Sequence, residues 1–263
     1  MELRDFAHRL VTSEDLEEKL GPPTSGWAAL SDRRPGPALR LAQPGRPPGL
    51  AIVPASRVRV PALAGMADPE QRGRILHALA NHELQAAELF AWALLTFPEA
   101  PAELRRGLAA ILRDEQRHTR MYIARCRSLG VGFGDLPVTG YFWGKTPAIR
   151  SPRDFICAMS LTFENANLDH TTDGAEAARR AGDAKTAAVI ERVHRDEIEH
   201  VRFGWRWLDR FREEGESPWE AYRRSLTWPL RPAKARGASF HRKGREAAGL
   251  DPEFIRRLEE SEA

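Results

Sequence analysis

The hexapeptide RDEQRH occupies residues 113–118, and RDEIEH occupies residues 195–200. Both begin with Arg-Asp-Glu and end with His, so the pattern Glu-x-x-His occurs twice in one chain. Side chains three residues apart on a helix are neighbours on one face. If both hexapeptides are helical, each presents a carboxylate and an imidazole to the same surroundings.

The hexapeptides lie in two of four long segments with helical periodicity. Apolar residues recur every three or four positions over about 70–97, 102–129, 152–181 and 184–214. The short turns FPEAP and AGDAKT join these segments in two antiparallel pairs, and a 22-residue connection separates the pairs. The sequence therefore predicts an all-α, ferritin-like four-helix bundle made of two helix pairs and a long crossover.

The acidic and histidine side chains of the hexapeptides fall on the apolar faces of these helices. Glu115 and His118 lie between Ile111 and Tyr122 of the apolar stripe, and the second pair is placed in the same way. An ionised carboxylate buried alone carries a large desolvation penalty. A bound metal ion would remove that penalty.

The partner helices offer matching carboxylates. Residues at the same height of an antiparallel pair are equally distant from the turn. Glu83 precedes Glu115 by 32 residues. Glu164 precedes Glu197 by 33 residues. Glu88 is the alternative on the first helix, but its separation of 27 residues from Glu115 breaks this symmetry.

The predicted metal ligands are one glutamate from each first helix and a Glu-x-x-His pair from each second helix: Glu83, Glu115, His118, Glu164, Glu197 and His200. Di-iron and di-manganese carboxylate bundles use this ligand set. Four carboxylates and two imidazoles suit iron or manganese, whereas closed zinc sites favour cysteine and histidine. The expected cofactors are two metal ions: iron, manganese, or a mixed Mn/Fe pair.

Further residues are predicted around the ligands. Asp114 and Asp196 precede the ligand glutamates and are expected to orient a histidine through its Nδ1–H. Arg117 completes the pattern Asp-Glu-x-Arg-His in the first hexapeptide. Tyr122 follows the first ligand histidine by one turn, as either a redox-active or a packed core tyrosine. Gly204 follows the second histidine, where it either leaves room for oxygen or substrate or permits close helix packing.

The chain is predicted to have three parts. Residues 1–69 form a short helix over 2–20 and a proline-rich extension that packs on the bundle. Ten of the 19 prolines lie in this extension, and proline interrupts helices. Residues 70–215 form the bundle, and residues 216–263 form a basic C-terminal extension.

The C-terminal extension is predicted to end in a short helix over 251–262. Residues 231–245 carry arginine and lysine but no acid. This basic run is expected to be a solvated tail or a strap over the bundle. It is also the segment through which a nucleic acid or another anionic partner would bind.

The overall composition is that of an ordinary soluble protein, with 42% hydrophobic and 29% charged residues. The net charge of +3 is weak evidence for nucleic-acid binding. No apolar run is long enough to span a membrane, and the N-terminus lacks a secretory signal. The two cysteines, Cys126 and Cys157, have no zinc-type spacing. A cytoplasmic monomer or dimer with reduced thiols is expected.

Longer motifs resemble known families. A glutamate followed about 30 residues later by Asp-Glu-x-Arg-His resembles the oxygen-activating members of the ferritin-like di-iron carboxylate superfamily. The segments NHELQAAELFAWALLTFPEAP, GFGDLPV, LTFENANLDH and DEIEHVRFG resemble an uncharacterised bacterial ferritin-like family of unknown function. The tRNA-hydroxylating di-iron proteins are a more distant likeness. The resemblance implies the fold and the two-metal site, and leaves the substrate open.

The leading functional hypothesis is a di-iron oxidase or monooxygenase that activates O2 to oxidise or hydroxylate a small molecule. Glu115 and Glu197 are candidates to bridge the metals. Electrons would come from an external donor, because the chain has no flavin, Rossmann or rubredoxin-like motif. The alternatives are a ferroxidase or peroxide-scavenging protein that handles iron, and a metal-stabilised binding module.

Overall fold

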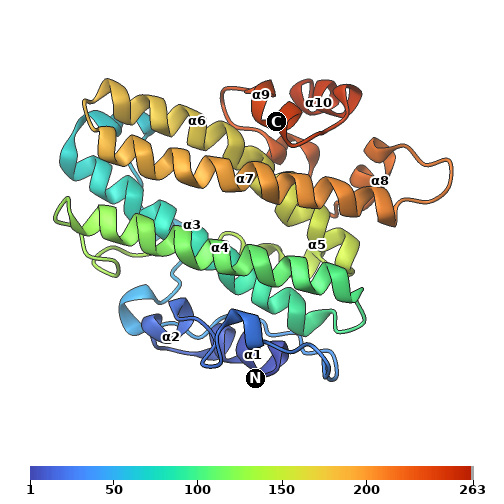
Figure 1. The fold of residues 1–263 in the computed structure, drawn as a ribbon. Coiled ribbons are helices and arrows are strands. Elements are labelled where there is room, and N and C mark those ends of the chain that lie inside the picture. The colour runs from blue at the N-terminus through green and yellow to red at the C-terminus, as the bar shows by residue number, and fades with distance from the viewer. Residues whose placement is uncertain (262–263) are drawn as a thin grey trace. The chain divides into compact units, whose positions relative to one another are not determined.

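The computed structural model describes residues 1–261, in which the regular secondary structure is helical and no strand occurs (Figure 1). The predicted all-α class is therefore confirmed. The chain divides into two compact units, Met1–Thr146 and Pro147–Ala263. Each unit contains one of the two predicted helix pairs, and each is described separately.

The helix pair of unit 1 consists of α3 (Pro69–Thr96) and α4 (Ala102–Arg127), which pack side by side (Figure 1). Both match the predicted ranges to within two residues. Asp68 starts α3, because its side chain accepts the N–H of Gln71 and Pro69 supplies a helical φ at the next position.

The N-terminal segment contains two helices, α1 (Leu3–Thr12) and α2 (Leu16–Leu20), where the sequence predicted one. The break occurs because Asp15 leaves the helical conformation and caps α2, accepting the N–H groups of Glu17 and Glu18. The proline-rich segment that follows forms only short 3₁₀ turns, at Trp27–Ala29, Pro48–Leu50, Ala55–Arg57 and Leu63–Ala67. A further 3₁₀ turn spans Trp143–Ala148.

A buried ion pair fixes this N-terminal segment to α3. Both carboxylate oxygens of Glu88 accept hydrogen bonds of 2.7 Å from Arg46. Lys19 Nζ lies 3.1 Å from the same carboxylate, and Trp143 Nε1 donates to it at 2.9 Å. Glu88 is fully buried, so these partners offset its desolvation.

The helix pair of unit 2 has an irregular first helix. It consists of α5 (Pro152–Ala158), a π-helical turn (Met159–Phe163) and α6 (Glu164–Arg180), where the sequence predicted one regular helix. Thr162 supports the turn, because its hydroxyl donates to Cys157 O at 2.7 Å and also bonds the Tyr222 hydroxyl at 2.7 Å. Gly182, with φ of +74°, begins the turn into α7 (Ala184–Phe211).

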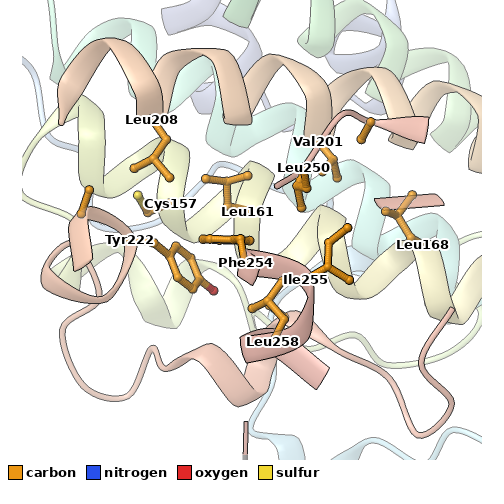
Figure 2. Close-up of a cluster of buried hydrophobic side chains, with 13 residues drawn as sticks. Cys157, Leu161, Leu168, Val201, Leu208, Tyr222, Leu250, Phe254, Ile255 and Leu258 are labelled. Atoms are coloured by element: carbon orange, nitrogen blue, oxygen red, sulfur yellow. The ribbon is translucent and has the colours of Figure 1, made fainter. Parts of the chain in front are cut away.

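The C-terminal segment folds onto its own helix pair through α8 (Pro218–Arg224), a 3₁₀ turn (Pro232–Ala235), α9 (Arg242–Ala247) and α10 (Pro252–Glu259). Figure 2 shows Tyr222, Phe254 and Leu258 of this segment in one buried apolar cluster with Cys157 and Leu161. The solvated-tail alternative is therefore wrong, and the segment is a strap.

A second buried ion pair fixes this strap to α6. Arg245 donates to the two carboxylate oxygens of Asp169 at 2.7 and 2.9 Å, and both side chains are 0% exposed. Asp169 also accepts the backbone N–H groups of Gly237 and His241 at 2.9 and 2.8 Å. Asp169 therefore neutralises the positive charge of Arg245 inside the fold.

The division into three parts stays a prediction, since the structure groups each extension with a helix pair. Both cysteines are buried free thiols. Within residues 1–261, no helix combines the length and apolar character needed to cross a membrane.

Candidate functional site

The first candidate half-site lies between α3 and α4 in unit 1 and consists of Glu83, Glu115 and His118. His118 Nδ1 lies 3.6 Å from Glu83 Oε2 and 3.5 Å from Glu115 Oε2. All three residues are at most 4% exposed. The mirrored positions about the helix turn therefore do bring these side chains together.

The second candidate half-site lies in unit 2 and repeats this geometry with Glu164, Glu197 and His200. His200 Nδ1 lies 3.8 Å from Glu164 Oε1 and 3.6 Å from Glu197 Oε2. All three residues are at most 5% exposed. Glu164 is the first residue after the π-helical turn, so its position depends on that irregularity as well as on the helical period.

The donor atoms of each half-site fit a metal ion. Within each half-site they all lie within 4.8 Å of one another. Carboxylate oxygens and imidazole nitrogens are ligands for iron, manganese and zinc. Like-charged carboxylates held this close in a buried site favour a cation among them.

Glu88, the alternative to Glu83, has a different role. Its carboxylate is engaged by Arg46, Lys19 and Trp143, as described above. Two hydrogen bonds from one guanidinium already satisfy both of its oxygens. Glu83 is therefore the glutamate of α3 that lies beside His118, the candidate ligand histidine of α4.

Asn167 was missed by the sequence interpretation. Its Nδ2 donates to Glu197 Oε1 at 3.0 Å, so it fixes one oxygen of a candidate ligand. A recognisable signal was present, since Asn167 follows Glu164 by three residues and so lies on the same face of α6. It was unremarkable in the sequence because a polar residue on a long helix is usually a surface residue.

The predicted supporting residues differ in their positions. Asp114 accepts a hydrogen bond of 2.7 Å from Arg117 on the same helix, and Asp196 lies 3.1 Å from Arg192. In both half-sites, histidine Nδ1 faces the glutamates. The expectation that Asp114 and Asp196 orient a histidine stays a prediction.

Tyr122 and Gly204 each had two predicted roles. Tyr122 is 1% exposed, and both of its predicted roles use a buried tyrosine. Gly204 packs against the π-helical turn, where an added Cβ would lie 2.4 Å from Ser160 Cβ and 3.3 Å from Leu161 Cγ. Close packing, and not space for oxygen or substrate, is therefore the reason for glycine at this position.

A family model described as "Protein of unknown function (DUF455)" matches residues 5–256. The chain belongs to this family. No curated protein and no solved structure matches the chain.

The matched range contains all six candidate ligands, Asn167, and both arginines of the buried ion pairs. The two half-sites and both buried ion pairs thus lie within the range that the family model matches. The family description assigns no activity. The chemistry of the side chains must supply the functional argument.

Proposed function

We propose that the protein binds two metal ions, most suitably iron, and activates O2 to oxidise or hydroxylate a small molecule. The observation that supports this is the repetition of one buried Glu, Glu-x-x-His cluster in each helix pair, with corresponding distances in the two clusters. Four glutamates carry four negative charges, which two divalent cations balance.

Each half-site would hold one metal ion of a pair, as in the di-iron proteins that the sequence resembles. One metal would be held mainly by Glu83, Glu115 and His118, and the other by the equivalent residues of unit 2. Glu115 and Glu197 would be the carboxylates available to both ions. A mixed Mn/Fe or di-manganese pair would use the same ligands.

When bound at these residues, a reduced iron pair would supply the electrons that O2 activation requires. The surrounding residues determine where this can happen. Burial of the candidate ligands excludes bulk water from each cluster. Exclusion of water would reduce side reactions of an oxidising intermediate with solvent. Each histidine must be deprotonated at Nδ1 to act as a ligand. Asn167 holds Glu197 in one orientation.

The electrons are proposed to come from an external donor. The only cysteines, Cys126 and Cys157, are buried, and burial raises the pKa of both thiols, to about 11 and about 12. Protonated, buried thiols are poor redox partners. A separate reductase would therefore complete the catalytic cycle.

The test is anaerobic reconstitution of the full-length protein with Fe(II), followed by air. We expect two irons per chain and a spectrum of magnetically coupled iron. Repeated reduction and reoxidation should leave the iron bound, whereas an iron-handling ferroxidase would release oxidised iron.

Glu197→Ala should lose one metal. Glu199→Ala is the matched control, because Glu199 is an exposed glutamate on the same helix that pairs with Arg202. Binding of less than one metal per chain, or equal binding by the two variants, would refute the proposal. Two uncoupled metals would show two separate mononuclear sites instead.

A further inference from the structure

Unit 1 contains a cavity of about 190 Å³ that is distinct from the half-site on α3. Its walls are residues 57–60, residues 136–139, and a face of α3 that includes Arg74, His77 and Asn81. Asn81 precedes Glu83 by two residues, which corresponds to a rotation of about 200° around a helix. Asn81 therefore faces away from the half-site, whereas His82, which also lines the cavity, lies about 100° from Glu83 around the helix.

The charge of this cavity is positive. Arg57, Arg59 and Arg74 line it, and no lining residue is acidic. Among residues 1–261, no carboxylate forms an ion pair with any of these three arginines. Arg74 Nε is buried and has no hydrogen-bond partner in the described chain. Buried polar groups normally have a partner, so this donor is available to an acceptor that enters the cavity.

His77 adds a hydrogen-bond donor without adding charge. Its Nε2 accepts the backbone N–H of Gly134 at 3.1 Å, and burial lowers the pKa of the ring. A neutral imidazole that accepts at Nε2 carries its proton on Nδ1. Asn81 is fixed as part of the wall, because it donates to Thr139 O and accepts from Arg46.

The rest of the lining limits the ligand's size and character. Val58, Val60, Leu136, Pro137 and Val138 supply apolar surface. The volume is below the roughly 300–1,000 Å³ typical of pockets for drug-sized ligands. A compact anion with a short apolar part fits both properties.

We propose that this cavity binds a small oxyanion, a carboxylate or a phosphate, through Arg57, Arg59 and Arg74. Guanidinium groups match the geometry of both oxyanions and form paired hydrogen bonds with them. The three arginines come from two separate parts of the chain, α3 and the proline-rich segment. Binding would therefore hold the proline-rich segment against α3. This site is independent of the proposed metal chemistry.

The experiment is calorimetric titration of the full-length protein with inorganic phosphate and, separately, with succinate. A chelator first removes bound metal, so that neither anion can bind to a metal ion. Arg74→Gln is expected to weaken binding by at least about tenfold, the effect of losing a charged hydrogen bond. Arg106→Gln is the matched control, because Arg106 is an exposed arginine of α4 outside the cavity.

Arg57→Gln provides a second test at an exposed position, should Arg74→Gln unfold. Binding of either anion that is weakened in Arg57→Gln or Arg74→Gln and kept in Arg106→Gln supports the proposal. The preferred anion then identifies the ligand's acidic group. Absence of binding by the wild-type protein at millimolar concentrations overturns it, as does equal binding by the cavity and control variants.

Discussion

Replacement of Asn167 by alanine tests whether Glu197 is a positioned metal ligand. The substitution removes one hydrogen bond of 3.0 Å to a carboxylate oxygen. A hydrogen bond to a charged group contributes about 1.5–3 kcal/mol. Loss of a group that orients a ligand typically weakens metal binding by about 10–100-fold. The free energy of the hydrogen bond and the expected change in metal affinity agree, since a tenfold change in affinity corresponds to about 1.4 kcal/mol.

The assay is competition for Mn(II) between the protein and a chelator of known affinity. Thr172→Ala is the control, because the Thr172 hydroxyl bonds only Leu168 O of its own helix, at 2.8 Å, among the contacts described. We expect Asn167→Ala to lose 10–100-fold in affinity, and Thr172→Ala to bind like the wild-type protein. Asn167→Asp keeps the side-chain size but places a second carboxylate beside Glu197, so its loss should be at least as large.

Equal Mn(II) affinities for Asn167→Ala and Thr172→Ala would refute the reasoning. Glu197 would then be either correctly placed without Asn167 or outside the metal site. Glu197→Ala distinguishes these outcomes, because only a ligand loses affinity when it is removed itself.

Three other predictions concern stability. Arg245→Met leaves a buried carboxylate without its cation and should lower the free energy of unfolding by about 3–5 kcal/mol in urea denaturation, whereas Arg256→Met, in an exposed ion pair, should leave the urea midpoint nearly unchanged. Gly204→Ala would place a Cβ 2.4 Å from the nearest side-chain carbon, so overpacking should cost about 1–3 kcal/mol in the same assay. Burial lowers the pKa of His77 and His194, so the unfolded chain binds protons more readily than the folded one. The free energy of unfolding should therefore fall as pH drops below about 6.5, which urea midpoints of the metal-free protein on either side of that pH would measure.

The helix pairs were predictable because helical period and turn composition are local properties. The ends of α3 and α4 agree with the predicted ranges to within two residues. The association of Glu83 with His118 also followed from local information, since the short turn fixes the height of residues on both helices. The whole bundle arrangement stays a prediction.

The π-helical turn was not predictable, because its support comes from distant residues. Tyr222 bonds Thr162 from 60 residues away, and Gly204 of α7 closes against Ser160. Nothing within the segment itself marks the extra residue of the turn. A search for apolar residues every three or four positions assumes a regular α-helix, so it does not detect a π-helical turn.

The basic C-terminal run was misleading for a related reason. The sequence shows that its arginines outnumber acids locally, but ion pairing is a property of the fold. Arg245 pairs with Asp169, which lies 76 residues earlier in the sequence. Its guanidinium carbon also lies 3.9 Å from the centroid of the Phe240 ring. Counting charged residues in the sequence does not distinguish the buried Arg245 from the solvated basic residues around it.

The two buried ion pairs have a consequence for synthesis of the chain. Glu88 and Asp169 each follow a candidate ligand glutamate by five residues, yet Arg46 precedes its partner and Arg245 follows its partner. A ribosome therefore releases the first cation before its acid, but releases the second acid long before its cation. Because chains fold from the N-terminus as they emerge, unit 1 can close its ion pair while unit 2 is still being made. Unit 2 must wait for Arg245, 76 residues after Asp169, so a chain terminated before Arg245 would carry a buried Asp169 without its cation.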